Sequence, residues 1–203
     1  TARTINSGQS CIAAKRFIVE APIAERVEEL FAGRMKKLEV GDPLDPKTEI
    51  GPMARPDLRD TLHDQVLDAL QQRATLLCGG DRVDRAGFFY QPTVISGVKP
   101  TMRVFEEETF GPVAAMIRAD NARDAIAIAN HSVYGLGASL WTRDLDRARE
   151  LVGTIAAGSV FVNSMVVSDP RLPFGGIRES GYGRELGAHG IREFTNVKTI
   201  SIA

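Results

Sequence analysis

The chain has 203 residues, 43% of them hydrophobic and 25% charged, and its 25 basic and 26 acidic residues leave a formal net charge of −1. This is the composition of a globular protein, and a chain of this length can bury roughly 70% of its extended surface without disulfides or metals. Balanced charge and few aromatic residues argue against a nucleic-acid partner. No apolar run reaches the length of a transmembrane helix, which argues against a membrane partner.

Two cysteines and three histidines make no recognisable metal or disulfide pattern. Cys11 and Cys78 lie far apart without a C-x-x-C pair, so we expect no metal site and a reducing, cytoplasmic location. The first ten residues, TARTINSGQS, have neither an initiator methionine nor the apolar core of a signal peptide. We therefore expect the sequence to begin inside a longer polypeptide.

Two amphipathic helices are predicted in the first part of the chain. Pro22 suits the first turn of a helix, and apolar residues then recur at helical spacing as far as Leu38. The GDPLDP segment at 41–46 stops this helix because glycine and proline interrupt its hydrogen bonds. A second helix is expected from Pro56 to about Ala74.

Strands then alternate with helices. Strand patterns occupy 75–78, 88–96, 112–119, 135–142 and 159–163. Asn121 should cap a helix that runs to His131, and Asp144 should cap a helix that Gly158 ends. The two strand-helix-strand units predict parallel pairing with right-handed crossovers. The expected fold class is therefore α/β, with a mostly parallel twisted sheet flanked by helices.

The last part of the chain is rich in glycine and proline from Ser164 to Gly190, which predicts a long functional loop. Phe174 and Tyr182 argue against disorder there. The final segment, NVKTISIA at 196–203, alternates in polarity. It predicts a terminal strand that pairs with another chain, and hence a homo-oligomer.

Cys11 is the first candidate for chemistry. It follows Asn-Ser-Gly-Gln-Ser and precedes small helix-forming residues, so its thiolate is expected to face the positive end of a helix. A thiol of pKa about 8.5 is only ~3% ionised at pH 7, and lowering that pKa by two units takes roughly 2.7 kcal/mol. Burial as a small apolar side chain is the alternative for Cys11, and it is the expectation for Cys78.

Two further segments could bind a ligand. Three carboxylates at 106–108 precede Phe110 and a turn into a strand, where a carboxylate could accept hydroxyl hydrogen bonds beside a stacking ring. A solvated charged turn is the alternative reading. The segment 173–185 holds four glycines without a phosphate-binding pattern, so it predicts a substrate wall with Phe174 packed inward.

Together these three segments resemble the aldehyde dehydrogenase family over essentially the whole chain. NSGQSC is similar to the family's nucleophile segment, EETFGPV to its cofactor-contacting turn, and LPFGGIRESGYGRE to its signature near the C-terminus. The resemblance implies an oxidoreductase that uses NAD or NADP. It also implies a catalytic domain at 1–195, an oligomerisation strand at 196–203, and a preceding cofactor-binding domain that this chain lacks.

Site residues follow from the same resemblance. Cys11 would add to the aldehyde carbon, and its backbone N–H would form half of the oxyanion hole. Glu108 would accept from the nicotinamide ribose, with Phe110 near the nicotinamide ring. Phe174 would line the aldehyde tunnel, and Ser168 falls where substrate choice varies. The general-base glutamate and the oxyanion-hole asparagine would lie outside the chain, so we expect little or no turnover from these residues alone.

Within the family, NSMVVSDPRLPFGG and GYGREL are similar to the succinate-semialdehyde dehydrogenase branch. The distal carboxylate of that substrate needs an arginine and hydroxyl donors, for which Arg171 and Ser168 are candidates. Some members of the branch carry an arginine six residues before the cysteine. That position is Ile5 here, with Arg3 nearby.

Three other functions remain open from the sequence. A cysteine hydrolase would pair Cys11 with His131 or His189. A non-catalytic assembly module would use only the terminal strand. A CoA-acylating reductase of related fold would transfer the acyl group to CoA and not to water.

Overall fold

The computed structural model describes all 203 residues, which form two compact units, Thr1–His131 and Ser132–Ala203. No helix in either unit is both long enough and apolar enough to cross a bilayer.

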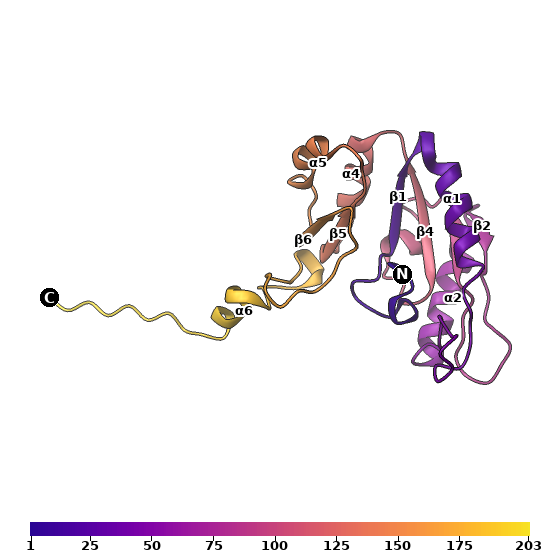
Figure 1. Ribbon diagram of the computed structural model, residues 1–203, viewed down its shortest axis with the longest axis horizontal. Helices are drawn as coiled ribbons and strands as arrows, with labels where there is room; N and C mark the ends of the chain where they lie inside the picture. Colours follow the sequence, from indigo (N-terminus) through magenta and orange to yellow (C-terminus); the bar gives the residue numbers. More distant parts are fainter. The chain divides into compact units, whose positions relative to one another are not determined.

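The first unit is built on a four-stranded sheet with the order β1-β4-β3-β2 (Figure 1). β4 (Val113–Ala119) lies at the centre and runs parallel to β1 (Arg16–Glu20) and to β3 (Thr93–Ser96). β2 (Thr75–Cys78) pairs with β3 in the antiparallel sense. The predicted mostly parallel α/β sheet is confirmed.

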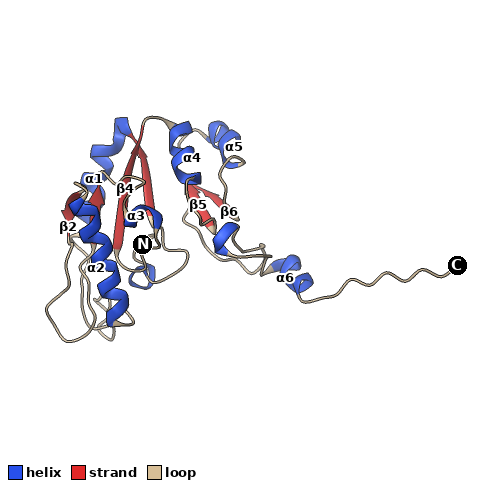
Figure 2. Ribbon diagram, turned by 180° about the vertical axis from the view of Figure 1, so that it is seen from behind, coloured by secondary structure: helices blue, strands red, loops and turns tan.

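Helices cover both faces of this sheet (Figure 2). They are α1 (Ala21–Met35), α2 (Pro56–Gln71), α3 (Arg103–Glu106) and α4 (Ala122–Asn130). Because successive strand residues point to opposite faces, Val113 and Ala115 of β4 join a core that includes α2, and Ala114 and Met116 join a core that includes α1. β4 is therefore covered on both faces.

Local signals in the sequence explain where these helices begin. A proline occupies the first turn of both α1 and α2, where a missing N–H costs nothing. The predicted cap of α4 is confirmed, because Asn121 Oδ1 accepts from the N–H groups of Arg123 at 3.0 Å and Asp124 at 3.1 Å.

A buried carboxylate ties α1 to the sheet. Glu28 accepts from Ser96 Oγ at 2.5 Å and from Arg118 Nη2 at 2.8 Å. The bond from Arg118, and then that from Ser96, holds the pKa of Glu28 below its ordinary value against the opposing effect of burial. The pairing fixes α1 against β3 and β4.

The second unit has a two-stranded parallel sheet of β5 (Gly137–Leu140) and β6 (Ser159–Val162), joined through α5 (Leu145–Val152). The predicted cap of α5 is confirmed, since Asp144 Oδ1 accepts from Arg147 N at 2.9 Å. Beyond β6 lie a short 3-10 turn at Arg178–Ser180 and α6 (Gly187–Glu193).

Several predicted boundaries are wrong. α5 ends at Val152 with Gly153 as its cap, five residues before Gly158, because Thr154 N already bonds back to Leu151 O in a tight turn. The strand expected at 88–96 begins only at Thr93, since Pro92 has no N–H to contribute. One of the two predicted parallel pairings is also wrong, because β4 and β5 belong to different sheets.

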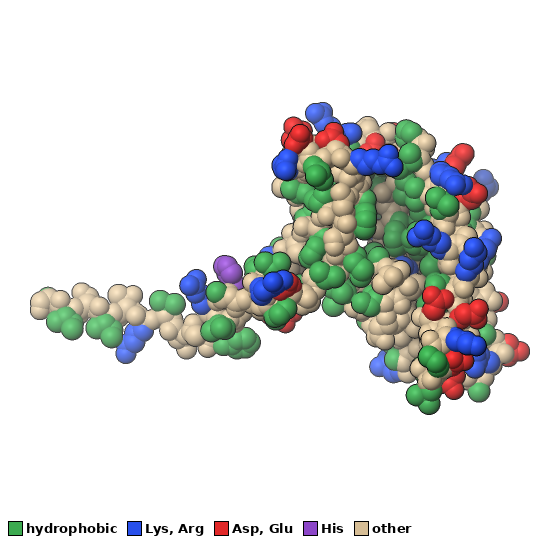
Figure 3. Space-filling view, in the orientation of Figure 1, with side chains coloured by type: hydrophobic (Ala, Val, Ile, Leu, Met, Phe, Trp, Pro, Cys, Tyr) green, Lys and Arg blue, Asp and Glu red, His purple; other side chains and the backbone are tan.

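Two differences concern strands. β1 has no counterpart among the predicted elements, because it runs directly into α1 with no turn residue between them. Residues 196–203 form no strand within this single chain, and Val197, Ile200 and Ile202 are exposed along them (Figure 3). Their pairing with another chain stays a prediction, as does the boundary between residues 1–195 and 196–203.

Candidate functional site

Cys11 lies on a loop with a left-handed backbone, residues 5–11, which we call the cysteine loop. Asn6, Ser7 and Gly8 have φ values of 49°, 55° and 79°. Such angles are costly for residues other than glycine, so surrounding contacts must hold them. Within the loop, Gln9 N donates to Asn6 O at 2.9 Å and Asn6 Nδ2 donates to Gln9 O at 3.1 Å.

The segment 51–54 anchors the cysteine loop from one side. Gly51 N donates to Ser7 Oγ at 2.9 Å, and Ala54 N donates to Gln9 Oε1 at 2.8 Å. The Ser7 and Gln9 side chains therefore satisfy backbone donors that precede α2, and the loop is fixed to that helix start.

The predicted helix after Cys11 is wrong. Ser10–Ala13 form a single turn closed by Ala13 N on Ser10 O at 2.9 Å, and the chain then enters β1. The aromatic and β-branched residues of β1 favour a strand over the helix that Ala13 and Ala14 suggested. No helix N-terminus therefore follows the sulfur.

The two cysteines differ in access. Cys11 is exposed and Cys78 is buried, and both are free thiols. Burial raises the pKa of Cys78, which packs in the core between α1 and the sheet. Cys78 is the apolar filler that its sequence context predicts, whereas Cys11 is reachable by a solute.

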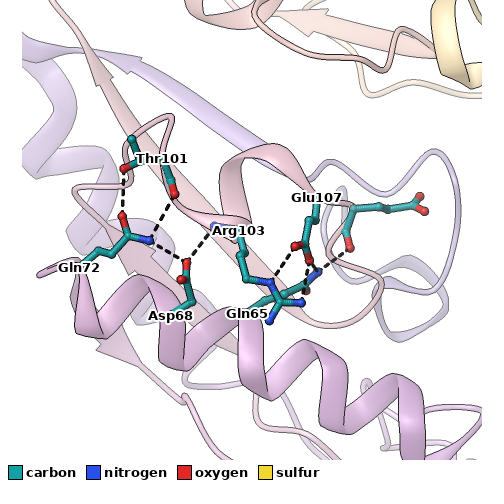
Figure 4. Close-up of polar contacts among 7 residues, drawn as sticks. Gln65, Asp68, Gln72, Thr101, Arg103 and Glu107 are labelled. Carbon is teal, nitrogen blue, oxygen red and sulfur yellow. Dashed lines mark hydrogen bonds and ion pairs between the residues drawn. The ribbon is translucent and has the colours of Figure 1, made fainter.

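The three carboxylates and Phe110 lie at the end of α3 and on the turn that leads to β4, residues 106–110, which we call the acid turn. Glu106 and Glu108 are exposed, Glu107 and Phe110 are half-buried, and Thr109 is buried. Arg103 pairs with Glu107 at 2.7 Å and, as the larger cause, holds the pKa of that carboxyl below its ordinary value, with help from Gln65 (Figure 4). The acid turn is thus braced through Glu107, and Glu108 is left open to a ligand.

The cysteine loop packs directly on the end of the acid turn. A Cβ at Gly8 would come within 2.1 Å of Gly111 O, so only glycine fits there. Parallel pairing explains the approach, because the cysteine loop precedes β1, the acid turn precedes β4, and Arg16 lies opposite Ala115. Two segments distant in sequence therefore meet at one end of the sheet.

Arg3 links the two segments and was not among the predicted site residues. It is 2% exposed, and its guanidinium donates to Gly8 O at 2.7 Å and to Thr109 Oγ1 at 3.4 Å. Burial lowers its pKa to about 10, against the attraction of Glu108. Since it is engaged inside the protein, Arg3 cannot take the place of the arginine that Ile5 replaces. Its burial and its distant partner have no signature in sequence.

The histidines give the hydrolase hypothesis no support in the first unit. The ring of His131 contacts Phe105 edge-on at 5.6 Å, and His63 Nδ1 lies 3.1 Å from Tyr90 Oη. Neither imidazole makes a hydrogen bond with Cys11.

The predicted substrate residues lie in the second unit. Ser168 is exposed, and the Arg171 side chain, 85% exposed, pairs with Asp169 at 2.6 Å. That pairing holds the pKa of Asp169 below its ordinary value. Phe174 is half-buried, and its N–H and C=O both bond to Glu185 at 2.8 and 2.7 Å. The glycine-rich segment is therefore an ordered loop closed by a two-residue bridge.

Comparison with known proteins places these features in one family. The aldehyde dehydrogenase family model matches residues 1–200. A Mycobacterium tuberculosis protein named succinate-semialdehyde dehydrogenase (NADP+) 1 is 53% identical over all 203 residues, and the chain covers 44% of that protein. A Mycobacterium leprae protein named succinate-semialdehyde dehydrogenase (NADP+) is 51% identical over 203 residues, and the chain covers 44% of it.

Solved structures agree with the sequence matches. A succinic semialdehyde dehydrogenase from Streptococcus pyogenes in complex with NADP+ superposes with a TM-score of 0.95 at 38% identity, over 99% of this chain and 44% of that one. A Mycobacterium tuberculosis aldehyde dehydrogenase complexed with NAD+ gives 0.92 at 37% identity, over 96% and 41%. The chain thus spans less than half the length of the proteins it matches. With the family model covering nearly all of its residues, the chain belongs to the aldehyde dehydrogenase family.

Proposed function

We propose that this chain carries the catalytic cysteine and part of the cofactor site of an NADP-dependent enzyme that oxidises succinate semialdehyde to succinate. The observation that carries the proposal is the exposed Cys11 on a strained loop packed against the acid turn. The names of the relatives support the substrate and the cofactor. Two unpaired cysteines suit a reducing compartment such as the cytoplasm.

In this proposal Cys11 acts as the nucleophile. Its thiolate adds to the aldehyde carbon, and the oxyanion of the resulting thiohemiacetal accepts from the backbone N–H of Cys11. Loss of the aldehyde hydrogen as hydride leaves a thioester on Cys11. Water then adds to the thioester carbon and releases the carboxylic acid with the thiol.

The acid turn supplies the cofactor contacts that this chain contains. Glu108 offers an exposed carboxylate for ribose hydroxyls, and the half-buried ring of Phe110 offers an apolar surface for a flat heterocycle. This donor set fits the nicotinamide half of NADP+. When bound, the nicotinamide accepts the hydride.

The second unit supplies the proposed substrate contacts. Arg171 is an exposed cation that can exchange Asp169 for the distal carboxylate of succinate semialdehyde, and the exposed Ser168 can donate a hydroxyl hydrogen bond to it. Phe174 provides the apolar wall for the methylene chain. The exposed apolar residues of 196–203 provide the assembly surface. Deleting this segment should convert the oligomer to a smaller assembly, as measured by its mass in solution.

The two cysteines give a direct test in the full-length protein that carries this sequence. Cys11→Ser should lower kcat/KM for succinate semialdehyde by at least about 10³-fold, because an alcohol is a far weaker nucleophile than a thiolate. Cys78→Ser, which alters a core position, is the matched control and should retain activity. Comparable activity in Cys11→Ser and wild type would reject the proposal. Formation of succinyl-CoA in place of succinate would reassign the enzyme to the CoA-acylating class.

A further inference from the structure

One side chain of α2, that of Gln65, is hydrogen-bonded to the acid turn. Gln65 is 3% exposed, and its Nε2 donates to Glu107 Oε2 at 2.9 Å and to the backbone oxygen of Glu108 at 3.1 Å (Figure 4). A buried amide with both bonds satisfied is a rigid connection, because breaking either leaves a desolvated polar atom.

A second set of bonds holds the same carboxylate of the acid turn. Arg103 donates to Glu107 through Nε at 2.7 Å and Nη2 at 3.0 Å, and its backbone N–H donates to Asp68 Oδ2 at 2.9 Å (Figure 4). Glu107 therefore lies between Arg103 and Gln65. Both of these partners are bound to, or belong to, α2.

Of these side chains, Gln65 is the one that hydrogen-bonds to Glu108. The Glu108 side chain is exposed, so the position of its own backbone decides where its carboxylate can reach. The bond from Gln65 to the Glu108 carbonyl restrains that backbone directly.

We infer that Gln65 is a positioning residue for cofactor binding: its amide fixes the main chain at Glu108 so that the Glu108 carboxylate meets the ribose hydroxyls. This inference rests on the proposed function of Glu108. Because Gln65 is buried, in this proposal it acts through Glu108 and not by direct contact with the cofactor. Its removal should weaken cofactor binding and leave the reactivity of Cys11 intact.

Gln72, the residue that caps the C-terminal end of α2, provides a matched control. It also bridges α2 to the segment around α3, donating to Asp68 Oδ2 at 3.0 Å and accepting from Thr101 Oγ1 at 2.9 Å. It makes no contact with Glu108. A role of Gln65 that is merely structural would therefore be mimicked by the loss of Gln72.

The experiment compares Gln65→Met and Gln72→Met in the full-length protein that carries this sequence. Steady-state kinetics give KM for NADP+, KM for the aldehyde and kcat, and fluorescence titration gives Kd for NADPH. The rate of Cys11 alkylation by iodoacetamide reports on the nucleophile. Gln65→Met should raise KM and Kd for the cofactor about three- to tenfold, with little change in the alkylation rate. Gln72→Met should leave all of these near wild type.

Two additional variants separate the ways in which the inference could fail. Gln65→Asn keeps an amide but is too short to span both acceptors, so it should reproduce the cofactor effect even where methionine prevents folding. Glu108→Ala should weaken cofactor binding at least as much as Gln65→Met. If Glu108→Ala has no effect, the proposed role of Glu108 is wrong. If Glu108→Ala weakens binding and the Gln65 variants do not, or if Gln72→Met matches them, the inference about Gln65 is wrong.

Discussion

At the level of single residues, two partly or fully buried basic side chains belong to the segment that carries the predicted nucleophile. Arg3 is enclosed between the cysteine loop and the acid turn, and Lys15 lies four positions beyond Cys11. Burial, with a smaller contribution from Arg16, lowers the pKa of Lys15 to about 7, although Glu108 and its acidic neighbours oppose the shift. The charge of the Lys15 ammonium therefore changes near neutral pH.

A pH dependence of stability follows for Lys15. In the unfolded chain its pKa is the ordinary 10.5, so between about 7 and 10.5 the unfolded state holds a proton that the folded state has released. The contribution of Lys15 to stability therefore rises with pH across that window. Urea unfolding at pH 6, 8 and 10 should show Lys15→Met losing its advantage over wild type as the pH increases. The exposed Lys99 provides the control variant, and a difference for Lys15→Met that stays constant with pH would contradict the expectation.

Arg171 carries a second prediction at the residue scale. Arg171→Ala in the full-length protein should raise KM for succinate semialdehyde by about tenfold, because a charge-assisted bond to the distal carboxylate is lost. KM for an uncharged aldehyde of similar length should change little. Arg149→Ala is the control variant, because Arg149 is also exposed and pairs with an aspartate, Asp146, at 2.5 Å. Equal effects on both aldehydes would remove Arg171 from the substrate site.

At the scale of elements, the site depends on how two loops enter neighbouring strands. β1 and β4 are parallel and adjacent, so the loops that precede them share one end of the sheet. Gly8 and Gly111 are in contact there, and α2 supports the acid turn from the other side. The arrangement of strands and helices thus brings the predicted nucleophile and the predicted cofactor contacts together.

The contact at Gly8 can be tested against a matched glycine. Gly8 and Gly97 both have positive φ, at 79° and 71°, but a Cβ at Gly97 would meet nothing within 4 Å. Gly97→Ala should cost about 1 to 2 kcal/mol of unfolding free energy, from backbone strain alone. Gly8→Ala should cost a further 1 to 3 kcal/mol or so, because it must also displace Gly111 O. Denaturation of both variants measures the difference. Equal losses of unfolding free energy would show that the cysteine loop can move away from Gly111 at little cost.

Many of these helices and strands could be predicted from the sequence. Helical spacing identified α1 and α2, side-chain caps identified α4 and α5, and apolar runs identified β2, β4 and β6. The failures have physical causes. β1 lacks a turn before α1, and the alanines after Cys11 have helix propensity that pairing with β4 overrides.

The site itself was only partly visible in the sequence. Cysteine, glutamate and phenylalanine carry recognisable chemistry, so Cys11, Glu108 and Phe110 could be proposed from their motifs. Arg3 and Gln65 act through burial and through partners distant in the chain, which no local pattern encodes. Only the three-dimensional structure brings them next to the site.

On the scale of the whole molecule, the chain covers 44% of the length of its Mycobacterium tuberculosis relative. No Gly-rich nucleotide-phosphate pattern occurs in it, and the resemblance places the general base and the oxyanion-hole asparagine outside it. We therefore expect the proposed reaction to need residues beyond these 203.

This yields a prediction for the isolated polypeptide. The purified 203-residue chain, mixed with succinate semialdehyde and NADP+, should form little or no NADPH by absorbance at the nicotinamide band. Alkylation of Cys11 in the same sample should still proceed, because the thiol is exposed. The full-length protein under identical conditions is the positive control. Robust NADPH formation by the short chain would contradict the expectation.

Because Arg16 pairs with Ala115, the number of residues between Cys11 and Arg16 determines where the sulfur lies relative to β4. One residue added in extended form between Cys11 and Arg16 would move the sulfur by up to about 3.3 Å. That step is as large as the separation of atoms about to react, about 3 to 3.5 Å. Insertions in the exposed loop at 42–47 would leave that distance unchanged. We therefore expect chain length to be more restricted ahead of β1 and β4 than in exposed loops remote from the cysteine loop.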